Sequence, residues 1–239
     1  MPLRKNCYSR LLTSAGCLLL LSACTVQGTP LQGQEEEKTP ADQRAEKVLH
    51  DSEAPEIVET GALLPTERLL STGVLDLGER DAPLTLLIFT EYHCNYCKEF
   101  NSEHLIHLTS DFVNKGSLRV QLASFPLQKY AQSENAAKAV ICAAEQNKGL
   151  AMNNLLFASA YKDPGSALNF AKELGINTEA FESCMESEET QATIARHREW
   201  ARSLGVQYVP TFFLNGEKFV GLPYYADLRG QIEEALRTR

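Results

Sequence analysis

Positive charge is scarce in this chain of 239 residues: 23 Lys and Arg stand against 31 Asp and Glu, and the formal net charge is −8. Nucleic acids and anionic lipid surfaces attract basic proteins, so this balance argues against both as partners. The sequence also has no internal repeat and no glycine-rich motif of the kind that cradles phosphate. These absences exclude a repeat architecture and a nucleotide-binding loop.

The N-terminal residues are typical of a targeting segment. Met1–Cys24 begins with basic residues, continues into an apolar region rich in leucine, and closes with small residues. The segment is too short to span a bilayer as a stable helix. Its last residues, Leu21-Ser22-Ala23-Cys24, resemble the bacterial lipoprotein signal, which implies that residues 1–23 are removed and that the sulfur of Cys24 carries a diacylglycerol. A plain secretory signal with a coincidental cysteine is the alternative, and either signal exports the protein.

Residues 24–65 are predicted to form an acidic, largely disordered tether. The stretch is rich in Gln, Glu, Thr and Pro, contains the run Glu35-Glu36-Glu37, and has no aromatic residue. Because it cannot bury enough apolar surface, it cannot order itself. A short helix at Ala41–His50 is expected to be a spacer rather than a dimerisation helix, so we expect a monomer.

A Cys-x-x-Cys motif marks the point where a predicted strand becomes a predicted helix. Leu84–Thr90 is rich in β-forming residues, and the residues after Cys94-Asn95-Tyr96-Cys97 have helix propensity and an apolar repeat. The free N–H groups of a first helical turn and the helix dipole stabilise a thiolate, and Cys94 is placed to benefit. The sequence therefore predicts a redox-active dithiol.

The other predicted elements complete an α/β pattern. Further strand segments are predicted at 74–77, 117–125, 206–214 and 218–220. The last two flank Asn215-Gly216, a strong hairpin signal. Residues 131–204 carry only helical signals, and Ser133 is predicted to cap the first helix. A final amphipathic helix is predicted at Tyr225–Arg237.

Export determines how the seven cysteines are interpreted. Three lie within the first 24 residues, so four remain in the rest of the chain. An even set in an oxidising compartment can be fully paired. With Cys94 and Cys97 joined to each other, Cys142 is expected to join Cys184. Two free buried thiols at these last two positions are the alternative.

Two motifs in order along the chain carry a family resemblance. The first is DAPLT at 81–85 followed by FTEYHC at 89–94, and the second is LGV at 204–206 followed by PTFFLNG at 210–216. Together they resemble the DsbA-like thiol:disulfide oxidoreductases of the thioredoxin superfamily, over about Val74–Leu236. The resemblance implies an α/β thioredoxin fold for residues 66–239, with an inserted helical domain at about 131–204.

The resemblance also implies roles for residues around the dithiol. Cys94 is expected to be the attacking thiol, and Cys97 is expected to resolve the mixed disulfide. The Val209–Pro210 bond is expected to be cis and to lie beside the dithiol. There it would leave backbone groups free to pair with an extended client peptide.

Four further residues are expected to tune the site: Glu91, His93, Asn95 and Tyr96. Asn95 and Tyr96 replace the Pro-His pair of the best-known oxidase of the family, so the resemblance leaves the pKa of the first cysteine open. Glu91 and His93 flank the dithiol and are expected to act on it in opposite senses. The family's buried acid, six residues before the first cysteine, does not carry over, because that position is Ile88.

These features predict an exported thiol:disulfide oxidoreductase of the bacterial periplasm or cell envelope, held to a membrane through Cys24. It is expected to transfer a disulfide from Cys94 and Cys97 to folding client proteins without a cofactor. If the protein is an oxidase, a membrane partner of the DsbB type is expected to reoxidise its dithiol. A disulfide reductase or isomerase is the alternative.

Metal carriage is the competing interpretation from another class of protein. Cys94, Cys97, His104 and His107 are ligand types that suit zinc or copper. The two histidines lie at least about two helical turns beyond Cys97, so the helix keeps them from meeting Cys94 at one ion. We therefore predict no metal site. His197, in a hydrophilic stretch, is expected to be solvated at the surface.

Overall fold

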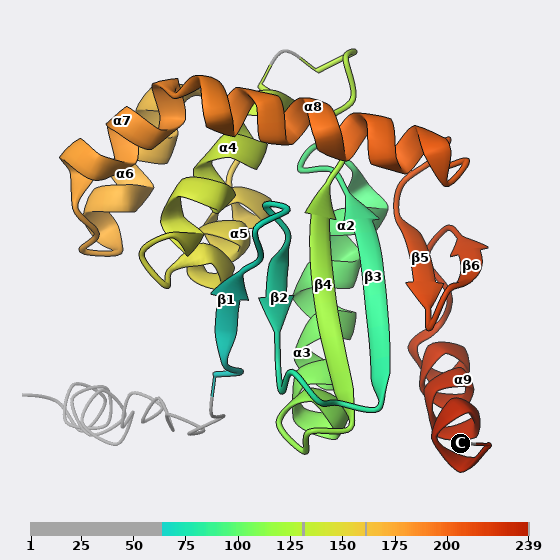
Figure 1. Ribbon diagram of the computed structural model, residues 1–239. Coiled ribbons are helices and arrows are strands. Elements are labelled where there is room, and N and C mark those ends of the chain that lie inside the picture. Colours follow the sequence, from blue (N-terminus) through green and yellow to red (C-terminus); the bar gives the residue numbers. More distant parts are fainter. Residues whose placement is uncertain (1–63, 131, 161, 239) are drawn as a thin grey trace, which may run out of the picture. The chain divides into compact units, whose positions relative to one another are not determined.

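The structure, a computed structural model, describes residues 64–130, 132–160 and 162–238 (Figure 1). The predicted signal peptide, Cys24 and all but the last residues of the predicted tether lie outside the described residues, as does the short helix at Ala41–His50. None of the helices within these ranges combines the length and the apolar character that a membrane span needs.

A mixed sheet forms the centre of the described domain. In the order in which they lie side by side, its strands are β1 (Glu67–Leu69), β2 (Leu75–Leu77), β4 (Leu118–Ser124), β3 (Leu84–Thr90), β5 (Thr211–Leu214) and β6 (Glu217–Val220). β3 and β4 run parallel, and the other neighbouring strands run antiparallel. A parallel pair needs a crossover connection, which residues 95–113 supply as a helix.

Strand β3 is buried on both faces because a separate apolar cluster packs on each side of the sheet there. Leu84, Leu86 and Ile88 pack in the main core with the crossover helix, whereas Leu87 and Phe89 belong to a second cluster on the opposite face. A strand covered on both sides needs apolar residues at successive positions rather than at alternate ones. This explains the unbroken apolar run that precedes the dithiol.

Helices surround this sheet in three groups (Figure 1). The crossover consists of α2 (Asn95–Glu99), the π-helical η1 (Phe100–His104), α3 (Leu105–Leu108) and the π-helical η2 (Thr109–Val113). The insertion between β4 and β5 consists of α4 (Ser133–Ala144), α5 (Gly149–Ala158), α6 (Pro164–Glu173), α7 (Thr178–Glu186) and α8 (Glu188–Ser203). The last helix is α9 (Tyr225–Arg237). In Figure 1, α8 runs from the insertion across one end of the sheet to β5.

Within the insertion, α4 and α7 are joined by the Cys142–Cys184 disulfide. The two Cα atoms lie 5.6 Å apart, an ordinary separation for this bond. Phe181, on the turn of α7 before Cys184, is 1% exposed and packs in the main core. The bond therefore ties α7 to the helix that packs against the sheet, as the sequence predicted.

Three local predictions were wrong or incomplete. The strand predicted at 206–214 begins only at Thr211, because residues 206–210 form the loop that carries the cis-proline. Strand β1 was not predicted, because its three residues carry no distinct β pattern and are held by pairing with β2. Ser133 does not cap α4: Gln132 takes the N-cap position and makes no side-chain cap bond. The Ser133 hydroxyl donates instead to the carboxylate of Glu91. The predicted hairpin and the final helix are confirmed.

Candidate active site

The turn after β3 places Cys94 at the start of a helix. Cys94 is the N-cap of α2, with extended backbone angles (φ −85°, ψ 120°), and its sulfur accepts a hydrogen bond from the backbone N–H of Cys97 at 3.4 Å. The Cys94 side chain is partly exposed, whereas Cys97 is fully buried. Both are free thiols in this structure. The first cysteine is therefore the one that a second molecule can reach.

The surroundings of the two thiols separate their pKa values. A hydrogen bond from the Cys97 thiol lowers the pKa of Cys94 from 9.0 to about 6, helped by the backbone N–H groups of Cys97 and Tyr96 and opposed by partial burial and by the charge of Glu91. Burial raises the pKa of Cys97 far above its usual range, and the neighbouring Cys94 raises it further. One thiolate thus forms readily, at the accessible sulfur.

The loop before β5 brings Val209 and Pro210 to the dithiol. The Val209–Pro210 peptide bond is cis, as the family resemblance implies. The carbonyl oxygen of Val209 lies 3.4 Å from the sulfur of Cys94, within hydrogen-bonding distance of the thiol. Pairing of β5 with β3, which sets Thr211 opposite Phe89, fixes this loop against the strand that leads to Cys94.

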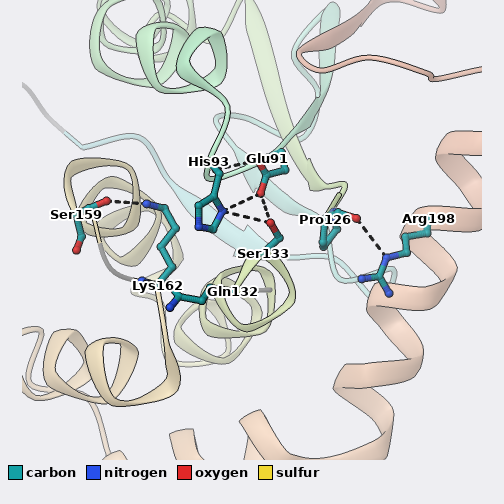
Figure 2. Close-up of polar contacts among 8 residues, drawn as sticks. All are labelled: Glu91, His93, Pro126, Gln132, Ser133, Ser159, Lys162 and Arg198. Atoms are coloured by element: carbon teal, nitrogen blue, oxygen red, sulfur yellow. Dashed lines mark hydrogen bonds and ion pairs between the residues drawn. The ribbon is translucent and has the colours of Figure 1, made fainter. Parts of the chain in front are cut away.

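Glu91 and His93, on the turn before Cys94, form a polar cluster with Ser133 of α4 (Figure 2). Glu91 is 1% exposed. Its carboxylate accepts hydrogen bonds from the Ser133 hydroxyl and from the backbone N–H of His93, the latter at 2.8 Å. The Nδ1 atom of His93 lies 3.2 Å from the carboxylate and 3.2 Å from the Ser133 hydroxyl. Glu91 is thus a buried acid three residues before Cys94. The position six residues before Cys94, where the family has its buried acid, is Ile88 in this chain.

Asn95 and Tyr96, the two residues between the cysteines, are exposed. Tyr96 is 63% exposed, and Tyr208, next to Val209, is 69% exposed. Two aromatic rings therefore stand in solvent near the accessible sulfur and its neighbouring loop.

Behind the site, a buried amide network that the sequence did not indicate joins the dithiol turn to the insertion. Tyr92 donates to Asn153 of α5 at 3.1 Å, and the Asn153 amide donates to Asn101 of η1 at 2.6 Å. Asn101 donates in turn to Asn154 at 3.0 Å. No spacing rule connects residues 92, 101 and 153, so only the fold reveals this connection.

Two histidines beyond the site, His104 and His197, have structural roles. His104 is buried, and its Nε2 atom lies 3.0 Å from the carbonyl oxygen of Pro223. His197 was predicted to be solvated, but this was wrong: it is 2% exposed and its Nε2 atom lies 2.8 Å from the carbonyl oxygen of Thr72, because α8 packs against the loop before β2. Within the described ranges, no three His, Cys, Asp or Glu side chains are grouped as a metal site would require.

The fold and the site together define a class of protein. A thioredoxin-type sheet carries an accessible low-pKa thiol and a buried partner thiol at a strand-to-helix turn, beside a cis-proline loop. This arrangement is that of a thiol–disulfide oxidoreductase, in which the first sulfur exchanges with a substrate and the second resolves the mixed disulfide.

Comparison with known proteins agrees with this class. The model of a family described as thioredoxin matches residues 71–234. The chain belongs to the thioredoxin family, and it is a DsbA-like oxidoreductase of that superfamily. Over 170 residues it is 25% identical to the probable disulfide bond formation protein D of Bacillus anthracis, covering 67% of this chain and 77% of that protein.

Solved structures share the fold at lower sequence identity. BdbD from Bacillus subtilis superposes with a TM-score of 0.64 at 22% identity, over 73% of this chain and 98% of that one. Alpha-DsbA1 of Wolbachia pipientis superposes with a TM-score of 0.62 at 19% identity, over 74% of this chain and 94% of that one. The chain also matches a Na(+)/H(+) antiporter of Salinispora tropica, at 28% identity over 64% of this chain, but it spans only 25% of that protein.

Proposed function

We propose that this oxidoreductase is exported and donates disulfides to folding client proteins. The low pKa of Cys94 is the observation that carries the proposal. A site that stabilises the Cys94 thiolate favours its own reduced form, so its disulfide gives up its bond readily to other thiols. The similarity to a probable disulfide bond formation protein supports the same direction of transfer.

The exposure of the two sulfurs sets the order of events. A client thiolate attacks the sulfur of Cys94, the accessible one. The bond between Cys94 and Cys97 breaks, and Cys97 leaves with the electron pair and takes up a proton, which its raised pKa holds. A second client thiolate then attacks the client sulfur of the mixed disulfide, and Cys94 leaves as a thiolate. Two electrons pass from client to enzyme, and of the two protons that the client thiols lose, one is bound at Cys97 and one goes to solvent.

The loop at Val209 and Pro210 is the proposed client-binding surface. Because the Val209 carbonyl lies 3.4 Å from the reacting sulfur, an extended segment that pairs with this loop brings its own cysteine to Cys94. The exposed rings of Tyr96 and Tyr208 offer apolar contact to that segment without selecting one sequence.

The proposal also includes the cellular location of the protein and its attachment to a membrane. Residues 1–23 would act as a lipoprotein signal, Cys24 would carry the lipid, and residues 24–65 would hold the catalytic domain of residues 66–239 away from the membrane. This would place the enzyme in the bacterial periplasm or cell envelope as a monomer. Net disulfide donation requires reoxidation, so a membrane oxidase of the DsbB type is the expected partner.

The reduction potential of the Cys94–Cys97 pair tests the direction of transfer. A value of about −120 mV supports a donor of disulfides, and one of about −270 mV refutes it in favour of a reductase. The charge of Glu91, which raises the pKa of Cys94, favours the reductase alternative. A copper or zinc carrier would be revealed by stoichiometric metal on the reduced protein that is lost on Cys94→Ser.

A further inference from the structure

Glu91 is a buried carboxylate on the turn that holds the reactive sulfur. Its side chain is inaccessible to solvent, and its backbone carbonyl accepts the N–H of Cys94 at 3.2 Å. A buried charge is costly unless polar groups or an opposite charge compensate it. The partners of this carboxylate therefore decide how strongly its charge acts on the turn.

Ser133, from the first turn of α4, is the partner that comes from outside this turn. Its hydroxyl donates to the Oε1 atom of Glu91 and lies 3.2 Å from Nδ1 of His93 (Figure 2). The hydroxyl has one proton to donate, and its bond to the carboxylate uses it. Ser133 thus holds the Oε1 atom of the carboxylate, while the backbone N–H of His93 holds the Oε2 atom.

Compensating positive charge around this carboxylate is weak. Among the ion pairs of the described residues, His93 is the partner of Glu91, and it is charged only when protonated. The nearby buried amine of Lys162 donates to the carbonyl oxygen of Ser159 at 2.6 Å (Figure 2). Burial lowers the pKa of Lys162, while the charge of Glu91 raises it. The hydroxyl of Ser133 is therefore a principal stabiliser of the Glu91 charge.

We propose that Ser133 is a positioning residue of the redox reaction: its hydroxyl holds the Glu91 carboxylate and its dipole offsets part of the field of that charge, and so sets how strongly the charge opposes the Cys94 thiolate. The inserted helical domain thereby tunes the dithiol, in addition to the residues between the cysteines. This inference rests on the redox role of Cys94 and Cys97 but not on the direction of transfer.

A coupled pair of substitutions, Ser133→Ala and Glu91→Gln, tests this role. The measured quantity is the equilibrium constant for oxidised protein plus two glutathione thiols giving reduced protein plus glutathione disulfide. Glu91→Gln removes the opposing charge, so this constant should rise about tenfold, which is about 30 mV for a two-electron couple. Ser133→Ala removes the hydroxyl dipole that offsets part of the carboxylate field, so the constant should fall about threefold, or about 14 mV. Combined with Glu91→Gln, Ser133→Ala should have no further effect.

Ser166→Ala is the matched control. It removes a hydroxyl that donates to Asp163 at 2.8 Å at the start of α6, in the same insertion, and it should leave the constant unchanged. An unchanged or raised constant in Ser133→Ala, or an equal decrease in the Glu91→Gln background, overturns the proposal. Glu91→Gln keeps Ser133 in place and tests the carboxylate separately: a constant that does not rise also overturns it. The wild-type potential tests the direction of transfer, whereas these differences between variants test the positioning role.

Discussion

At pH 7 the Cys94 thiol of the reduced protein should be almost fully ionised. The perturbation is pH alone, and the magnitude follows from the pKa of about 6 that the surrounding hydrogen bonds impose on this thiol. One pH unit above its pKa a group is about nine-tenths ionised, whereas a thiol with a pKa of 9.0 would be about one-hundredth ionised. Its reaction with an alkylating agent near neutral pH should therefore hardly depend on pH.

The direct assay is thiolate absorbance near 240 nm together with the alkylation rate, both followed from about pH 4 to about pH 10. One transition near pH 6 is expected, and Cys97 should contribute none in this range because its pKa is raised. Removing the Cys97 thiol deletes the hydrogen bond that lowers the pKa of Cys94 most, so Cys97→Ala should move the midpoint upward. A wild-type midpoint above about pH 8, the ordinary range for a cysteine, would refute the reasoning.

The same pKa determines how stability and potential vary with pH. Because the folded-state pKa of Cys94 is depressed, ionisation stabilises the folded reduced protein fully above about pH 9, and this contribution is lost as pH falls through about 6. Reduction takes up two protons below pH 6 and one above it. The potential should therefore fall by about 59 mV per pH unit on the acid side and by about 30 mV on the other. A constant slope of 59 mV up to pH 8 would contradict the assignment.

Three further predictions concern the disulfide, the resolving thiol and the network behind the site. Replacing both Cys142 and Cys184 by Ala opens a loop with a sequence separation of 42 and should lower the unfolding free energy by about 4 kcal/mol in urea titrations; a loss below about 1 kcal/mol would count against the chain-entropy account. Cys97→Ala should accumulate mixed disulfides with reduced client proteins, visible on non-reducing gels, and their absence would contradict its resolving role. Tyr92→Phe leaves the buried Asn153 amide oxygen without its donor and should cost about 1–3 kcal/mol in thermal unfolding, with no effect if that bond is not formed.

Much of the fold could be predicted because its signals are local. The unbroken apolar run before the dithiol, the Asn-Gly turn and the amphipathic pattern of Tyr225–Arg237 each determine an element through neighbouring residues, and the structure confirms all three. Strand β1 was missed because three residues carry no pattern of their own and become a strand only by pairing with β2.

The residues of the site also separate into those whose roles the local sequence predicts and those whose roles depend on distant partners. The redox dithiol and the thiolate expected at Cys94 follow from a spacing of three residues and from the position of Cys94 at a helix start. The attacking and resolving roles follow from the family resemblance. The local sequence of Ser133 gave a plausible but wrong role, as a helix cap, because its actual partner is 42 residues away. His197 was misjudged for a related reason: a hydrophilic helix can still bury one side chain against a distant loop.

By itself the sequence determined the chemistry at this site: two cysteines three apart where a strand becomes a helix, and a second pair to close the insertion. Only the tertiary structure decided what surrounds the reactive sulfur. It brings the Val209 carbonyl within 3.4 Å from a loop 115 residues away, and it sets Ser133 against the buried carboxylate of Glu91. The physical reason is that a thiol's pKa depends on groups within a few ångströms in space, whereas the sequence specifies only those that are near along the chain.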